Sequence, residues 1–393
     1  MKILVLNCGS SSLKYQLINM DNNEVIAKGN YERIGMDGSF LTHKFGNEKK
    51  VYENPVQNHE QAIAFTMAKF VEPGIAVISN LDEIDGIGHR IVHGGEKFTS
   101  SVVIDDEVVE GIKDAIKFAP LHNPAHIQGI EACMKALPGK KNVAVFDTAF
   151  HQTMPKESYM YAIPYEYYEK YGVRKYGAHG TSHKYVTERI AEILGRDDLK
   201  VVSCHIGQGA SISAVQNGKC VDTSMGLTPL GGIPMGSRSG DLDPSVVTYI
   251  MDKEGLSPKE MENILNKKSG LLGLSGISAD NRDIEAAIAE GNEQAQLAVN
   301  HYAYKIAGYV ARYAASMNGA DVIVFTAGVG ERGINERKMI CKYLGFMGVE
   351  LDEELNNVKA EEKEISKPDS KVKVWIVPTN EELMIAKETL RLI

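Results

Sequence analysis

A phosphate-binding turn is predicted near the start of the chain. Residues 3–6 form a short apolar run that fits a buried strand, and Gly9 permits a tight turn after it. Ser10 to Ser12 then offer hydroxyls and unhindered backbone N–H groups to an anion, and Lys14 adds a positive charge. Glycine and serine also form hairpin turns for conformational reasons alone, so this motif needs support from other parts of the chain.

The same hairpin pattern occurs a second time in the middle of the sequence. Residues 201–224 again read as a strand, a Gly-rich turn with Gly207 and Gly209, a strand, an Asn-Gly turn and a further strand. The first copy likewise continues through Asn22 and Asn23 into another strand. This self-similarity predicts a duplicated unit, so that the two halves share one fold.

Arginines, histidines and one aspartate occur at the predicted ends of elements, where catalytic groups usually lie. Arg90 follows a strand and Asp147 ends another, over residues 143–147. His179 leads into a helix N-terminus, which favours negative charge, and Arg238 precedes a later helix. These positions predict a site for an anionic substrate.

The histidines allow a second interpretation, as metal ligands. Three pairs have the i,i+4 spacing: His89 and His93, His122 and His126, His179 and His183. Zinc is disfavoured, because Pro124 and Gly180 interrupt two pairs and no intervening glutamate completes a zinc-hydrolase helix. We expect four of the histidines to be core or helix-cap groups with satisfied hydrogen bonds: His93, His126, His151 and His183.

A nucleotide pocket is predicted in the C-terminal half. The strand 321–326 runs into a Gly-x-Gly turn at Gly328 and Gly330, ahead of a helix over 335–344. A glycine turn after a buried strand fits a backbone pressed against a nucleotide. Residues 280–282, Asp-Asn-Arg, would form a second wall of the pocket.

The last helix is predicted to begin with an acidic turn. Residues 379–382, Thr-Asn-Glu-Glu, read as a capping box, whose glutamates stabilise the start of a helix. Glu381 is also placed to reach a metal ion. The two roles remain open from the sequence.

Length and composition restrict the class of protein. A chain of 393 residues suits two domains of about 150 residues or more each. The net charge of −9 argues against a nucleic acid or an anionic membrane as partner, and no apolar segment approaches a membrane-spanning length. Five scattered cysteines without CxxC spacing favour reduced thiols and a cytoplasmic location.

The periodicity of the remaining segments predicts an α/β architecture. Expected helices cover 123–137, with Ile127, Ile130 and Met134 buried, 181–195, a segment from 243–244 onward, and 293–317. Expected strands cover 86–92, 143–147, 321–326 and 372–377, all short and rich in β-branched residues. Residues 352–371 are expected to be a solvated surface segment.

The chain resembles the acetate kinase family along its whole length. Seven motifs carry the resemblance in order: Asn7-Cys-Gly-Ser-Ser-Ser, Gly88-His-Arg-Ile-Val-His-Gly-Gly, Ala119-Pro-Leu-His-Asn-Pro, Phe146-Asp-Thr-Ala-Phe-His, His179-Gly-Thr-Ser-His, Ser237-Arg-Ser-Gly-Asp and Thr326-Ala-Gly-Val-Gly-Glu. The resemblance implies the duplicated actin-like ATPase (ribonuclease H-like) fold, with two domains around a cleft. It implies reversible phosphoryl transfer between ATP and acetate, with Mg²⁺ or Mn²⁺, by a homodimer. The expected domains are 1–150 plus 381–393, and 151–380 with the nucleotide site.

The same motif matches imply roles for individual residues. Asp147, His179 and Arg238 would be catalytic, and Asn7 and Glu381 would serve the metal. Substrate contacts would come from Arg90, Val92, Leu121, His122, Ala178 and Pro229. Nucleotide contacts would come from Lys14, His205, Ile206, Gly207, Gln208, Gly209, Asp280, Asn281, Arg282, Gly328, Val329, Gly330, Glu331 and Arg332.

Three positions depart from the family's usual residues. Gln208 replaces an asparagine in the phosphate loop, Ala178 replaces a phenylalanine, and the family has an acidic residue near Gly231. Residue 178 is implied to line the pocket for the substrate's methyl group, so its missing ring leaves space for a longer acid such as propionate. A rival of another class is an actin-like scaffold that hydrolyses ATP without an acceptor. Arg90 and Arg238 argue against a scaffold, which has no need to bind a second anion.

Overall fold

The computed structural model describes residues 1–393, which divide into two compact units. Unit 1 comprises residues 1–152 and 380–393, and unit 2 comprises residues 153–379. The strands of unit 1 are β1 Lys2–Gly9, β2 Ser12–Asn19, β3 Glu24–Glu32, β4 Phe40–Phe45, β5 Glu48–Glu53, β6 Gly86–Ile91, β7 Val102–Val103 and β8 Lys141–Phe146. Its helices are α1 His59–Phe70, α2 Asp106–Asp114, α3 Asn123–Ala136 and α14 Glu381–Leu392.

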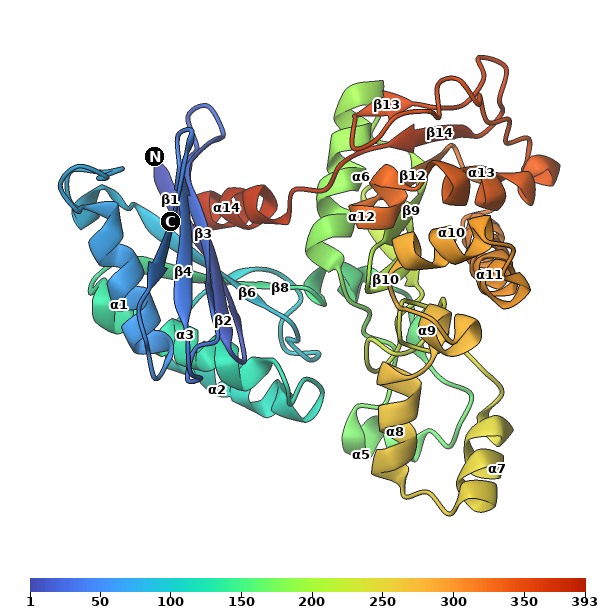
Figure 1. The fold of residues 1–393 in the computed structure, drawn as a ribbon, viewed down its shortest axis with the longest axis horizontal. Helices are drawn as coiled ribbons and strands as arrows, with labels where there is room; N and C mark the ends of the chain where they lie inside the picture. Colours follow the sequence, from blue (N-terminus) through green and yellow to red (C-terminus); the bar gives the residue numbers. More distant parts are fainter. The chain divides into compact units, whose positions relative to one another are not determined.

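The sheet of unit 1 lies between two layers of helices (Figure 1). Its strand order is β5-β4-β3-β2-β1-β6-β8-β7, with β1 antiparallel to β2 and parallel to β6. Successive side chains of β1 point to opposite faces, so Ile3 and Val5 pack with Ile385 of α14. Leu4 and Leu6 belong to the second core, which includes Cys133 of α3. Both faces of β1 are therefore buried, as its continuous apolar run predicted.

Gly88 of β6 sets how closely α14 approaches the sheet. A Cβ atom at this position would lie 2.3 Å from Thr389 Oγ1 and 2.6 Å from Ile385 Cγ2, both on α14. Only glycine allows this close packing. The contact matters for function, because β6 carries Arg90 and α14 begins at Glu381.

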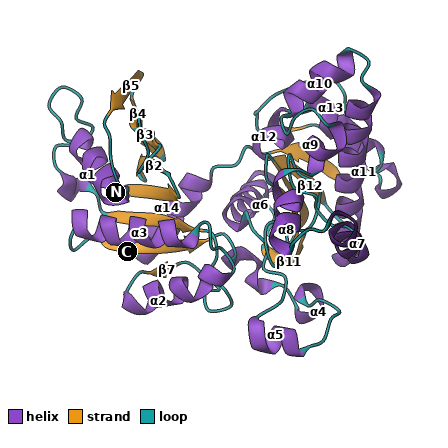
Figure 2. Cartoon of the chain, turned by 60° about the horizontal axis from the view of Figure 1, so that its bottom comes forward, coloured by secondary structure: helices purple, strands orange, loops and turns teal.

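Unit 2, like unit 1, consists of a sheet with helices packed against it (Figure 2). Its strands are β9 Lys200–Ile206, β10 Ala210–Gln216, β11 Lys219–Thr223, β12 Val322–Thr326, β13 Lys363–Glu364 and β14 Lys373–Ile376. Its helices are α4 Lys156–Tyr159, α5 Glu166–Tyr171, α6 Gly180–Leu194, α7 Pro244–Glu254, α8 Pro258–Lys267, α9 Gly270–Ser275, α10 Asn281–Ala289, α11 Glu293–Ser316, α12 Ala327–Arg332 and α13 Ile334–Lys342. Helix α6 and helix α11 lie on opposite sides of the sheet (Figure 1).

The two sheets repeat one strand order. In unit 1, the antiparallel strands β3-β2-β1 continue into the parallel strands β6 and β8. In unit 2, β11-β10-β9 continue into β12 and β14 in the same directions. Each set begins with one of the two hairpins found in the sequence. The predicted duplication is confirmed, and the chain has the duplicated actin-like ATPase fold.

Several local predictions were wrong. Met134 is 40% exposed, because it lies on the outer side of α3 rather than with Ile127 and Ile130. Residues 352–371 are not wholly solvated, since β13 pairs with β14 and Ile365 is fully buried in the core of unit 2. The glycines after β12 do not form an open turn, because α12 begins at Ala327 directly after the strand.

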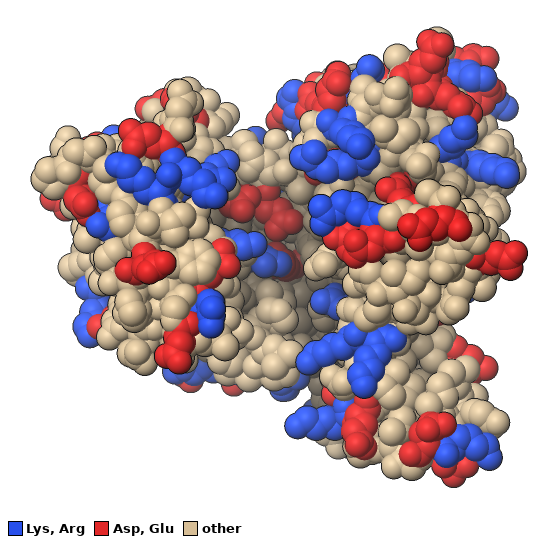
Figure 3. Space-filling model, in the orientation of Figure 1, with Lys and Arg blue, Asp and Glu red and all other residues tan.

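No helix has the length and apolar character needed to cross a membrane. Acidic and basic side chains are interspersed over the visible face of both units (Figure 3). All five cysteines are buried and none forms a disulfide.

Candidate active site

Unit 1 brings Arg90 and Asp147 together at the ends of two parallel strands. Arg90 lies near the end of β6, and Asp147 follows the last residue of the neighbouring strand β8. Arg90 donates to Asp147 Oδ2 from Nε at 3.1 Å and from Nη2 at 2.7 Å. The Asp147 residue is only 1% exposed, and its negative charge raises the pKa of the Arg90 guanidinium. Arg90 therefore carries a permanent positive charge at this strand end.

Glu381 opens α14 beside this pair. Burial raises the pKa of the Glu381 carboxyl group to about 7, against the lowering effect of Arg90, and the nearby Asp147 raises it further. The predicted capping box is wrong, because Asn380 is the N-cap and its side chain accepts from the Leu383 backbone N–H at 3.0 Å. Both glutamates nevertheless lie in the first turn of α14, as predicted for residues that stabilise a helix start. Because Glu381 is not the capping residue, its half-buried carboxyl group stays available for a cation.

A small cavity of about 20 Å³ gathers four predicted residues of unit 1. Asn7, Lys14, Arg90 and Glu381 line it, together with Glu382. Asn7 and Lys14 are direct partners in the β1–β2 register, which explains why the first hairpin places them side by side. Lys14, which was predicted to contact the nucleotide, is thus grouped with the residues predicted to serve the metal and the carboxylate.

The other predicted substrate residues of unit 1 lie near the start of α3 or after β6. Val92 is 8% exposed, whereas Leu121 is 75% exposed. His122 is the N-cap residue of α3, without a side-chain capping bond. An exposed leucine this large is available to a ligand.

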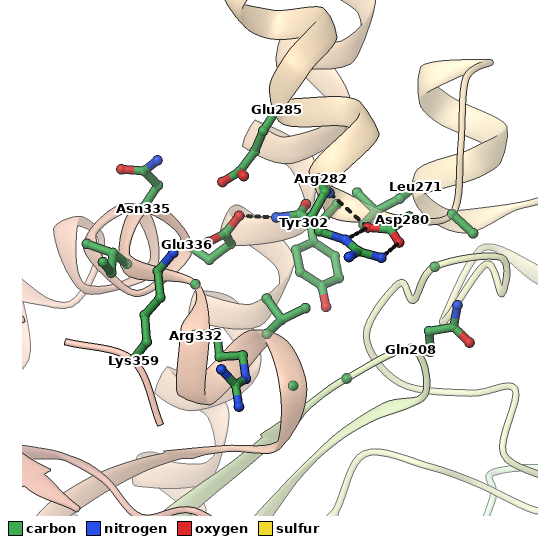
Figure 4. Close-up of a pocket in the computed structure, with 18 residues that line it drawn as sticks. Gln208, Leu271, Asp280, Arg282, Glu285, Tyr302, Arg332, Asn335, Glu336 and Lys359 are labelled. Carbon is green, nitrogen blue, oxygen red and sulfur yellow. Dashed lines mark hydrogen bonds and ion pairs between the residues drawn. The ribbon is translucent and has the colours of Figure 1, made fainter. Parts of the chain in front are cut away.

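Unit 2 contains a cavity of about 580 Å³, a size suited to a nucleotide (Figure 4). Eight of the predicted nucleotide residues line it: Gly207, Gln208, Asp280, Asn281, Arg282, Gly328, Val329 and Arg332. A Cβ atom at Gly207 would lie 3.7 Å from Ala327 Cβ and 4.0 Å from the Gly328 backbone nitrogen. The β9–β10 turn and the start of α12 therefore meet at one end of the cavity.

Five predicted nucleotide residues of unit 2 do not line this cavity: His205, Ile206, Gly209, Gly330 and Glu331. Ile206 belongs to the apolar core, and Gly330 packs against it. His205 is hydrogen-bonded to Ser182 Oγ at 2.7 Å. Glu331 accepts backbone N–H bonds from Ala327 at 2.9 Å and Thr379 at 3.1 Å, so it fixes two loops.

Sequence analysis missed the end of the cavity opposite the glycine turns. Glu285, Tyr302, Asn335, Glu336 and Lys359 line it, from four separate segments (Figure 4). Asn281 donates to the buried Glu336 carboxylate, which joins α10 to α13. Glu336 lies in the first turn of α13, where an acidic residue has an ordinary electrostatic explanation, so the sequence did not mark it as a site residue.

His179 and Arg238 flank Gly209 in unit 2. A Cβ atom at Gly209 would lie 3.4 Å from His179 Nε2 and 3.6 Å from Arg238 Nη1. Burial lowers the pKa of Arg238, and its Nη1 donates to the carbonyl oxygen of Pro229 at 3.1 Å. Two donors thus face one small space, where an anion would be stabilised. Ala178, next to His179, is buried with the apolar core.

Comparison with known proteins identifies close relatives over the full length. The model of the acetokinase family matches residues 2–387. An acetate kinase of Caldanaerobacter subterraneus is 58% identical, with 100% of this chain and 99% of that protein aligned. The crystal structure of Porphyromonas gingivalis acetate kinase has a TM-score of 0.97 at 50% identity, covering 100% and 99% of the two chains. A propionate kinase from Francisella tularensis has a TM-score of 0.93 at 45% identity, covering all of both chains.

Proposed function

This chain belongs to the acetokinase family, and we propose that it transfers the γ-phosphoryl group of ATP reversibly to acetate, giving acetyl phosphate and ADP. The family match carries this proposal. The site residues add to it, because they provide separate groups for a nucleotide and for a second anion. The nucleotide groups line the cavity of unit 2, and Arg90 serves the carboxylate.

The chemistry explains why the site is rich in cations and poor in bases. Acetate is already an anion, so its attack on phosphorus needs no strong general base. The difficulty is to hold an anion in line with a charged phosphate chain, and planar guanidinium groups can do this. Arg238 and the Nε2 atom of His179 are proposed to stabilise the transferring phosphoryl group as its charge spreads. Arg90 is proposed to orient the carboxylate.

Mg²⁺, or Mn²⁺ in its place, is proposed to bind through Asn7, Asp147 and Glu381. The residues fit such an ion, because Asp147 and the half-buried Glu381 repel one another and a cation would relieve that repulsion. Few protein ligands suffice, since Mg²⁺ keeps several waters and is bound largely by substrate phosphates. When bound, the ion neutralises charge on the phosphate chain.

A direct assay tests the proposed function. The purified protein with ATP, Mg²⁺ and acetate should form acyl phosphate, which hydroxylamine traps as a coloured hydroxamate complex with iron. The reverse reaction with ADP and acetyl phosphate should form ATP. If ATP is consumed equally fast with and without a carboxylate, the scaffold interpretation gains and the kinase proposal fails.

The metal proposal predicts a change in the Mg²⁺ requirement. Asp147→Asn and Glu381→Gln should each need more Mg²⁺ for half-maximal activity, because each removes a negative charge that the ion neutralises. Activity is measured over a Mg²⁺ titration at saturating ATP and acetate. Glu388→Gln, on the same helix α14 but outside the cavity, where its carboxylate accepts from Arg391 Nη2 at 2.9 Å, is the matched control and should leave the requirement near that of the wild type. Equal shifts in all three variants would contradict a specific role.

Propionate is a second candidate substrate, which Ala178 and the similarity to a propionate kinase favour. Ala178→Phe should lower kcat/KM for propionate relative to acetate by about tenfold to two-hundredfold, since one methylene in an apolar pocket is worth about 1–3 kcal/mol. Both acids are assayed with both proteins. An unchanged ratio would show that residue 178 does not contact the acyl chain.

We also propose that the protein works as a cytoplasmic homodimer on small molecules alone. Five buried cysteines without a disulfide support a reducing location. Large exposed side chains, such as Phe346 at 77% and Tyr304 at 58%, leave apolar surface that a second copy could cover. Light scattering of the purified protein tests the stoichiometry.

A further inference from the structure

A polar layer lies buried between α6 and the sheet of unit 2. On β9 and β10, Ser203, Ser211 and Ser213 are 0% exposed, and so is His183 on α6. The alternate residues of the same strands, such as Val202 and Ile212, belong to the apolar core. Burying hydroxyl and imidazole groups costs free energy unless each is hydrogen-bonded. Such a layer is stable only as a satisfied network.

Three hydrogen bonds join this layer to His179 in a single chain. Ser203 Oγ lies 2.8 Å from His183 Nδ1, and His183 Nε2 lies 2.8 Å from Ser211 Oγ. Ser211 Oγ in turn lies 2.9 Å from His179 Nδ1. The strands supply the two hydroxyl groups, while α6 and its N-cap supply the two imidazoles. The remaining atom of His179, Nε2, is the one that lies over Gly209 beside Arg238.

The direction of one bond in this chain fixes all the others. Ser211 has one hydroxyl proton and two imidazole neighbours, so it donates to one and accepts from the other. If it donates to His179 Nδ1, then His183 donates from Nε2 and accepts at Nδ1 from Ser203. His179 then carries its proton on Nε2. In the opposite direction, the proton of neutral His179 sits on Nδ1, and Nε2 becomes an acceptor that repels an anion.

We propose that Ser203, His183 and Ser211 are positioning residues that hold His179 in the Nε2–H form, ready to donate to the transferring phosphoryl group. This inference rests on the proposed function and extends it to residues that contact no substrate. A bound phosphoryl group selects the donating direction, because it accepts a hydrogen bond at Nε2. The stacking of His205 on His179, with ring centroids 4.1 Å apart, holds the plane of the ring.

The backbone conformation at His179 also needs support from contacts with other residues. This N-cap residue has φ 59°, in the left-handed region that non-glycine residues rarely adopt. The hydrogen bond to Ser211 and the stacked ring of His205 fix the side chain of a residue whose backbone is strained. Loss of this chain of hydrogen bonds should therefore change the orientation of the His179 imidazole as well as its tautomer.

Ser211→Ala tests the proposal, because it removes the link between the two histidines while adding no bulk. We expect kcat to fall by about tenfold or more, as loss of a group that orients a functional histidine typically costs about 10- to 100-fold. KM for ATP and acetate should stay within about twofold, since losing a contact made only in the transition state lowers kcat without changing KM. Nitrogen-15 NMR of labelled histidine should show His179 as Nε2–H in the wild type with ADP and phosphate, and as a mixture of tautomers in the variant.

Ser213→Ala is the matched control. Ser213 lies two residues along the same strand, is equally buried and bonds Thr223 Oγ1 at 2.8 Å, outside the chain to His179. It should keep wild-type kcat and the Nε2–H signal. The proposal is overturned if Ser211→Ala keeps wild-type kcat, if its tautomer is unchanged, or if both variants lose kcat in parallel with Tm. His179→Ala separates failure of the proposed function from failure of this inference. Full activity in His179→Ala would remove His179 from the mechanism, whereas the NMR result for Ser211→Ala still tests whether the hydrogen bonds control the His179 tautomer.

Discussion

Replacing Arg238 by alanine should lower kcat/KM by at least about a hundredfold, because loss of one donor to developing charge typically costs about 3–4 kcal/mol. The fold should survive. Arg238 has no carboxylate partner in the structure and bonds only a carbonyl oxygen of Pro229 and the sulfur of Met235. Removing it therefore leaves no charge buried without a partner. Steady-state kinetics in both directions, with circular dichroism as a check on folding, measure the effect.

Arg90→Ala should lower activity as strongly but should also destabilise unit 1. Its guanidinium holds the buried carboxylate of Asp147, and breaking such a pair by removing one partner typically costs about 3–5 kcal/mol. The KM for the carboxylate should rise more than it does in Arg238→Ala. A stable, fully active protein in either case would remove that arginine from the proposed mechanism. Equal losses of Tm in both variants would show that Arg238 is structural.

Gly209→Ala gives independent support for the Arg238 result. The new methyl group would fill the space between His179 Nε2 and Arg238 Nη1, at ordinary contact distances of 3.4 Å and 3.6 Å. It should therefore block the anion without straining the fold. Gly308→Ala on α11, where an added Cβ has no atom within 4 Å, is the control for a harmless alanine. Wild-type kcat in Gly209→Ala would place the transferring group elsewhere.

The sequence predicted the parts of the fold that depend on local patterns. Both hairpins combine short apolar strands with Gly-rich and Asn-Gly turns, and these signals act within a few residues. The same reasoning fails after β12, where the sequence predicts a Gly-x-Gly turn at Gly328 and Gly330 but the structure has helix α12. Glycine is tolerated in a short helix that begins with a left-handed residue, here Ala327 with φ 64°. Nothing in the sequence marks that residue.

The far end of the nucleotide cavity could not be predicted for a different reason. Glu285, Glu336 and Lys359 are charged residues on helices or loops, and such residues are usually solvated. Only the packing of α10 against α11 and of α13 nearby brings them to one cavity. His183 shows the limit of assigning a residue to the core. The prediction of a satisfied buried histidine is confirmed, yet one of its partners, Ser211, also links it to His179, which no local pattern shows.

Unit 1 should lose stability in mild acid, because four of its histidines are buried as neutral groups. Burial lowers the pKa of His43, His89 and His93 to about 4 and that of His126 to about 3. In the unfolded chain the ordinary value is about 6.5. The unfolded state therefore binds more protons below pH 6.5, so stability falls as the pH drops toward the folded values. Between pH 7.5 and 5.5 each histidine should cost about 1.4 kcal/mol.

Protonation of Glu381 has the opposite effect on stability, because it favours the folded state as the pH falls. Its folded pKa of about 7 lies above the ordinary value, so the folded state gains protons first as the pH falls from neutrality. By pH 5.5 the protonation of Glu381 should offset about 2 kcal/mol of the stability lost through the four histidines. The free energy of unfolding should therefore fall by about 3–4 kcal/mol in total. Domains are typically stable by only about 5–15 kcal/mol, so the loss is a large share of the total.

Urea unfolding at pH 7.5 and 5.5 measures this loss, and the single tryptophan separates the units. Trp375 lies on β14 of unit 2, whereas all four histidines lie in unit 1. At pH 5.5 the circular dichroism transition should begin at lower urea than the Trp375 fluorescence transition, because unit 1 is the part that acid weakens. His43→Gln should recover about a quarter of the histidine cost, or about 1.4 kcal/mol, relative to its own stability at pH 7.5. Coincident transitions with unchanged midpoints at both pH values would mean that these histidines are protonated in the folded protein.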